Sequence, residues 1–145
     1  MSEYNDLLKE QISASVFGIA LIIVLITVLL LLNKRRFFDD LGKIGKPAVN
    51  IFVIAVILLG GVYFSFRIIN LRKDIKDAAY ITYNGDFEVS SFKGSYVTLI
   101  DESGELKLDG RLDLSGGKYS GTIVYAENSR YILELKEYKK TGGNS

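Results

Sequence analysis

The stretch that decides the fold is ISASVFGIALIIVLITVLLLL, residues 12–32, which contains no charged side chain. In a helix with 1.5 Å rise per residue, about 20 residues span a hydrocarbon core roughly 30 Å thick, so this run is long enough to cross a bilayer. A second uncharged run, PAVNIFVIAVILLGGVYFSF, occupies residues 47–66. We therefore predict a membrane hairpin of two transmembrane helices, with residues 1–11 as an N-terminal tail and residues 33–46 as a basic connecting loop.

The composition excludes several classes of function. The chain has 145 residues and a net charge of +1, which gives no reason to expect a nucleic-acid partner. It has no Cys and no His, so disulfides, Cys/His zinc sites, Cys nucleophiles and His general bases are absent. Neither a calcium-loop spacing nor a phosphate-loop motif is present. We predict a non-enzymatic protein with no metal and no cofactor.

Small residues recur in both apolar runs at a spacing that lets helices approach closely. Ala14 and Gly18 lie four residues apart, as do Gly61 and Ser65, and Gly60 precedes the second pair. Small side chains at this spacing favour close helix packing in lipid. We expect these residues to pack the hairpin or to join copies of the chain into a homo-oligomer. Neither run contains an ionisable residue, which argues against a transporter or pump.

The positive charges that flank the two runs are nearly balanced. Cytoplasmic flanks normally carry the excess of Lys and Arg. The connecting loop and the opposite side carry five cations each: Lys34, Arg35, Arg36, Lys43 and Lys46 against Lys9, Arg67, Arg72, Lys73 and Lys76. The basic triplet that follows the first run favours a cytoplasmic loop. We therefore expect a multi-pass protein of the cell membrane with an extracytoplasmic C-terminal region.

The composition and the hydrophobic pattern change in the second half of the chain. Residues 67–78 place apolar side chains at helical spacing with charges between them, which predicts a solvated amphipathic helical stalk. Over residues 79–138, stretches rich in Tyr, Val, Ile, Thr and Leu alternate with turn residues and predict a six-stranded β domain, with a hairpin turn at Asn84-Gly85. The short connections predict a small all-β antiparallel meander, either a curled sheet or barrel-like. Residues 139–145 are polar and Gly-rich, as in a disordered tail.

Period-two alternation assigns side chains of the predicted strands to faces. The side chains expected on an apolar face include two sets: Tyr119, Ile123 and Tyr125, and Tyr131, Leu133 and Leu135. Outside the core, aromatic and basic residues form the candidate surface for a ligand or partner: Tyr96, Lys107, Arg111, Lys118 and Arg130.

The leading interpretation is a two-pass membrane protein that presents its β domain for protein binding at the membrane surface. Its partners would be the lipid bilayer and another membrane or envelope protein, and its role that of an accessory subunit or of a protective factor in immunity or exclusion. The alternative reverses the orientation, so that a cytoplasmic β sensor binds a small anionic ligand such as a nucleotide messenger and the helices perturb the membrane. A third interpretation, a pore former, requires a polar stripe that neither run shows.

Overall fold

A computed structural model describes residues 2–34, 45–90, 96–101, 104–110 and 112–142. The chain divides into two compact units. One, called the β unit below, comprises Met1–Leu8 and Asn70–Ser145, and the other, the helical unit, comprises Lys9–Ile69. The long helices begin or end in the β unit, so the two units are not successive segments of the sequence.

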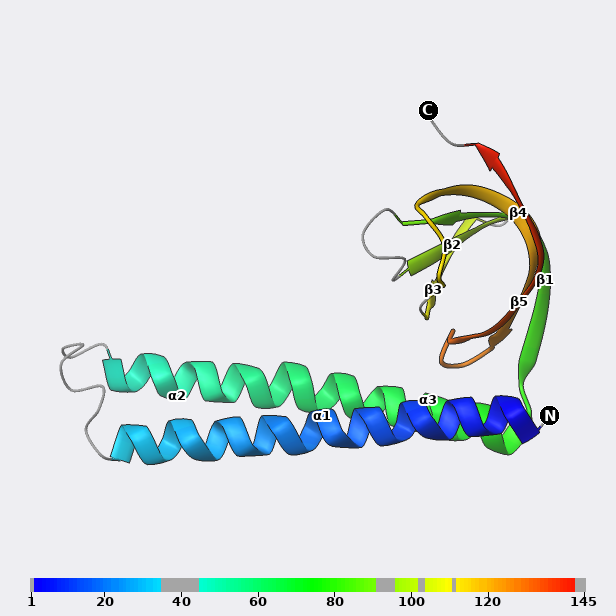
Figure 1. Ribbon diagram of the computed structural model, residues 1–145. Coiled ribbons are helices and arrows are strands. Elements are labelled where there is room, and N and C mark those ends of the chain that lie inside the picture. The colour runs from blue at the N-terminus through cyan, green and yellow to red at the C-terminus, as the bar shows by residue number, and fades with distance from the viewer. Residues whose placement is uncertain (1, 35–44, 91–95, 102–103, 111, 143–145) are drawn as a thin grey trace. The chain divides into compact units, whose positions relative to one another are not determined.

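The helices of the chain are long and continuous (Figure 1). Helix α1 spans Ser2–Lys34, and the second helical segment consists of α2 (Gly45–Val56), a π-helical turn η2 (Ile57–Gly61) and α3 (Val62–Asp77). Both segments are long and apolar enough to cross a membrane, by length and composition. The two predicted helices are confirmed, but α1 also includes residues 2–11, which we expected to form a tail.

The β unit contains a five-stranded antiparallel sheet. Its strands are β1 (Tyr80–Val89), β2 (Tyr96–Asp101), β3 (Gly104–Asp109), β4 (Gly117–Ala126) and β5 (Ile132–Gly142), in the spatial order β3-β2-β1-β4-β5. Strand β4 pairs with all ten residues of β1, whereas β2 pairs with β1 only over residues 87–89. Because the fourth strand returns to the first and not to the third, the topology is a Greek key, which corrects the expected meander.

The structure has five strands where we expected six. Asn84-Gly85 is not a turn, because both residues continue β1 and Gly85 pairs with Gly121 of β4. Long-range pairing thus overrides a local turn signal. Gly121 is needed for a close approach of two backbones, since a Cβ atom there would lie 2.4 Å from the carbonyl oxygen of Glu137. The sixth strand was expected over residues 111–114; Arg111 lies outside the described residues, and residues 112–114 lie in the connection between β3 and β4.

The sheet is bent but not closed. Register shifts in the β4–β5 ladder leave three extra residues on β5: Leu133, Glu137 and Thr141. Bulges of this kind bend a strand and increase its twist, and Figure 1 shows β1, β4 and β5 curving together. Among the described residues, one isolated parallel bridge, between Asp109 of β3 and Tyr131 just before β5, links the two outer strands. The sheet therefore does not close into the expected barrel-like form. Residues 139–142 belong to β5, which corrects the expectation of a disordered tail there.

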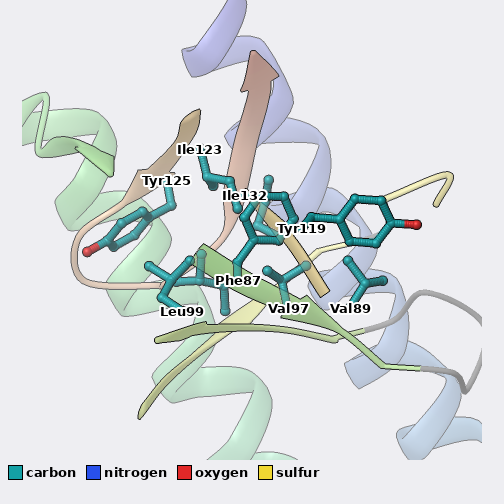
Figure 2. Close-up of a cluster of buried hydrophobic side chains, with 9 residues drawn as sticks. Phe87, Val89, Val97, Leu99, Tyr119, Ile123, Tyr125 and Ile132 are labelled. Carbon is teal, nitrogen blue, oxygen red and sulfur yellow. The ribbon is translucent and has the colours of Figure 1, made fainter. Parts of the chain in front are cut away.

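The hydrophobic core fills the space that the bent strands enclose (Figure 2). Its buried members are Phe87, Val89, Val97, Leu99, Leu108, Tyr119, Ile123, Tyr125 and Ile132. The predicted apolar face of β4 is confirmed, because its three predicted residues all belong to this cluster. The prediction for β5 is confirmed for Leu135, which packs against the core, but wrong for Leu133, because Ile132 is the cluster member instead. The extra residue Leu133 shifts the alternation by one position, which no local pattern reveals.

Candidate protein-binding surface

Two of the predicted partner residues, Lys107 and Lys118, lie in one row across the outer face of the sheet. Lys107 of β3 pairs with Thr98 of β2, Thr98 pairs with Glu88 of β1, and Glu88 pairs with Lys118 of β4. Two strands therefore separate the two lysines, and an acidic residue stands between them. Such a row is a mixed-charge surface and not a convergent pocket for an anion.

Tyr96 and Arg130 both neighbour Asp109, at a different place on the sheet. Tyr96 pairs with Asp109, whose backbone N–H donates a hydrogen bond to the carbonyl oxygen of Arg130 at 2.8 Å. Tyr96 is 56% exposed, and Arg130, with φ of 57°, lies exposed in the turn between β4 and β5. Arg111 lies outside the described residues. The described members of the predicted surface are thus divided between two places on the sheet.

The outer side of β3 is an open, regular strand edge. The ladder between β2 and β3 runs without a register shift from Tyr96↔Asp109 to Asp101↔Gly104. The N–H of Asp109 points away from β2, toward Arg130, and backbone groups alternate along a strand. The N–H and C=O groups of Lys107 and Glu105 therefore also point outward, and no backbone partner meets them among the described residues. Sequence reasoning missed this edge because the order of the strands creates it.

The opposite outer strand, β5, is protected against pairing. It carries three bulge residues, and its second half is exposed and rich in lysine: Lys136, Lys139 and Lys140. Bulges and lysines are the usual means by which proteins protect an edge strand from another strand. By contrast, β3 has no bulge and one lysine. The two edges of the sheet therefore differ in their capacity to accept a further strand.

A fully buried carboxyl group fixes the β4–β5 turn to the end of α3. Asp74 is 0% exposed, and its Oδ1 accepts hydrogen bonds from the backbone N–H and the side-chain Nδ2 of Asn128. Its Oδ2 accepts from the backbone N–H of Ser129, and all three distances are 2.8 Å. The predicted stalk is helical to Asp77, but it is not wholly solvated as we expected, because Asp74 is enclosed by this turn.

The first turn of α1 is docked on the same unit. The Tyr4 hydroxyl donates to the carboxyl group of Glu134 on β5, and the Tyr80 hydroxyl donates to the side-chain oxygen of Asn5. The Tyr4 and Tyr80 rings meet edge to face with centroids 5.5 Å apart. Two leucines of the helix ends are completely buried: Leu8 and Leu71. We call these contacts, together with those of Asp74, the anchor.

Three titratable groups of the anchor have altered pKa values, and the pKa of Tyr4 is raised, mainly by its hydrogen bond to Glu134. The hydrogen bond from Tyr4 lowers the pKa of Glu134, with a smaller lowering from Lys136, whereas partial desolvation opposes both. Burial raises the pKa of Tyr80, and the nearby Asp74 adds to this effect. At neutral pH the charged form of Glu134 is thus favoured as the acceptor for Tyr4.

The small residues of the helical unit take different positions. Phe64 packs over Gly18, where an added Cβ would lie 2.7 Å from the ring, and Ile22 packs over Gly60 at 2.6 Å. A Cβ at Gly61 would meet nothing within 4 Å. Gly61 and Ser65 instead line a shallow groove with apolar neighbours: Ile57, Leu58, Val62, Phe66 and Ile69. Ala14 is exposed on α1. Close packing within the hairpin therefore involves Gly18 and Gly60.

Within the described ranges, no group of three or more acidic side chains is placed so that it could hold a metal ion. No family model matches the chain, and searches of the curated proteins and of the solved structures also find no match. The inference of function consequently depends on the surfaces described above.

Proposed function

We propose that the chain is a non-enzymatic, two-pass membrane protein whose β unit binds another protein at the membrane surface. It acts as an accessory subunit of a membrane complex or as a protective factor in immunity or exclusion. The β unit and the first residues of α1 lie outside the cytoplasm, and the connecting loop lies inside.

The observation that carries this proposal is the outward-facing apolar surface of the helices. Only 6% of the most apolar window of each helix is buried, and Leu59 is 76% exposed. Exposing apolar area to water costs about 25 cal/mol per Å², so a surface of this extent requires an apolar environment. A lipid bilayer supplies that environment, and an even number of crossings keeps both chain ends on one side.

Protein binding is favoured by the chemistry that the β unit exposes. Tyrosine is enriched at protein interfaces, and Tyr96 and Tyr138 are both more than half exposed. The row from Lys107 to Lys118 across the outer face of the sheet mixes both signs of charge. The anchor holds this surface to the ends of both helices, which suits presentation at a membrane.

Single-cysteine labelling tests the topology in an otherwise Cys-free chain. We expect Lys107→Cys and Glu3→Cys to react with a membrane-impermeant maleimide in intact cells, and Lys43→Cys to react only after permeabilisation. The reverse pattern would overturn the orientation, and release of the chain by alkaline carbonate would overturn membrane insertion.

Photocrosslinking in cells tests protein binding. A photoreactive amino acid is placed at exposed positions on different parts of the β unit, one at a time: Tyr96, Lys118 and Tyr138. We expect a protein adduct of defined mass from at least one position, and none from Ile54 in the apolar run. Lack of adducts at every position of the β unit would contradict the proposal.

A further inference from the structure

The outer edge of β3 has the properties of a docking site for an extended peptide segment. The outward N–H and C=O groups of Glu105 and Lys107 have no partner among the described residues, and the neighbouring ladder with β2 is regular. A segment that adds to a sheet edge gains main-chain hydrogen bonds from such groups. The one closing contact on this side, at Asp109, leaves the rest of the strand accessible.

The side chains of β3 specify the chemistry of that segment. Leu106 and Leu108 face the core, so the alternate residues Glu105 and Lys107 lie on the outer face and give the accessible part of the edge one negative and one positive charge. Opposite charges directly across two strands are stabilising and like charges are destabilising. A complementary strand therefore carries a positive residue opposite Glu105, a negative residue opposite Lys107 and an apolar residue between them.

The same charges disfavour a second copy of this chain. In an antiparallel β3–β3 pair centred on Lys107, that lysine would face itself, which is repulsive, and Glu105 would need the place beside Asp109 that Arg130 and Tyr131 already occupy. Pairing of β3 with β5 of another copy is hindered by the bulges and lysines of β5. A segment of a different protein meets neither obstacle.

We propose that the edge of β3 binds an extended segment of a partner protein, with a negative residue opposite Lys107, a positive residue opposite Glu105 and an apolar residue between them. This inference rests on the proposed function and identifies the kind of partner segment that the β unit takes.

A synthetic peptide, Thr-Glu-Val-Lys-Thr, tests the proposal on the full chain in lipid nanodiscs by fluorescence anisotropy. We expect saturable binding, weakened about tenfold by Lys107→Glu, because an attractive pair becomes repulsive. The peptide with Lys in place of Glu should regain affinity for this variant. Lys139→Glu is the matched control, since Lys139 is an exposed lysine on the opposite outer strand β5, and it should leave binding unchanged.

Backbone methylation of the peptide separates strand addition from charge attraction. N-methylation at alternate residues blocks either the edge-facing or the solvent-facing N–H groups, so one of the two methylated peptides should lose binding and the other should retain it. Equal binding of both, no saturable binding at about 1 mM peptide, or equal effects of Lys107→Glu and Lys139→Glu would each overturn the proposal.

Crosslinking from Lys107 in cells separates this inference from the proposed function. Protein adducts from Tyr138 or Lys118 without one from Lys107 would refute the docking edge and leave the proposed function in place. Absence of adducts from all exposed positions of the β unit would refute both.

Discussion

The anchor and the β3 edge differ in whether their backbone N–H groups have hydrogen-bond partners within the chain. At the anchor, the backbone N–H groups of Asn128 and Ser129 are taken up by one buried carboxyl group. At the β3 edge, the N–H and C=O groups of Glu105 and Lys107 point away from the sheet. The hydrogen bonds of the anchor hold distant parts of the chain together. The outward backbone groups of the β3 edge can instead bond to another molecule. Stability should therefore depend on the anchor, and binding on the edge.

The largest effect is expected from Asp74→Ala, which removes the acceptor at the anchor. Three donors on partly buried residues lose their acceptor, and each unsatisfied donor costs about 1–3 kcal/mol when buried, so we expect a loss of about 3 kcal/mol in the free energy of unfolding of the β unit. Urea unfolding in mild detergent, followed by tyrosine near-UV circular dichroism, measures this. Asp77→Ala, on the exposed side of the same helix, should change little, and equal effects of the two variants would contradict the role of Asp74.

A smaller loss is expected from Gly121→Ala, which affects the ladder between the anchor and the far end of β5. The added Cβ would lie 2.4 Å from a backbone oxygen that cannot rotate away, and such overpacking costs about 1–3 kcal/mol. The same unfolding measurement applies. Gly61→Ala, where a Cβ meets nothing within 4 Å, should leave the β unit unaffected.

Acidification should weaken the docking of α1 within the anchor. The folded-state pKa of Glu134 is lowered, so its contribution to stability is present above the ordinary value of 4.5 and is lost as the pH falls through the lower folded value. A carboxyl-carbon NMR titration measures the pKa directly. Tyr4→Phe should raise the pKa of Glu134 toward its ordinary value, and an unchanged titration in this variant would refute the Tyr4 contact as the main cause.

The smallest effect on stability is expected from Lys107→Ala at the open edge. Exposed substitutions away from buried contacts usually change the free energy of unfolding by less than about 0.5 kcal/mol. If Lys107→Ala destabilised the β unit as much as Gly121→Ala does, the edge would be a structural element and the contrast with the anchor would fail.

The sequence predicted those features that depend on local composition. Uniformly apolar runs such as residues 12–32 identify helices because length and hydropathy suffice. Features that depend on distant residues could not be predicted from the sequence. Asn84-Gly85, for example, has the composition of a turn, yet pairing with β4 keeps it in a strand. Likewise, Asp74 resembles the solvated charges beside it on the helix, and only the turn at Asn128 makes it a buried acceptor. For the candidate surface, the sequence predicted which residue types are exposed. It did not predict which of these residues lie near one another, because that depends on the order of the strands.

The contact between Tyr4 and Glu134 joins residues 130 positions apart in the chain. During synthesis the first turn of α1 emerges long before β5, so its contact with β5 forms only after the intervening segments have been made. Completion of the β unit is thus a late, non-local event in biogenesis, and such long-range closure is intrinsically slow. A bulky fusion placed ahead of Ser2 would burden this final step far more than one placed after Gly142.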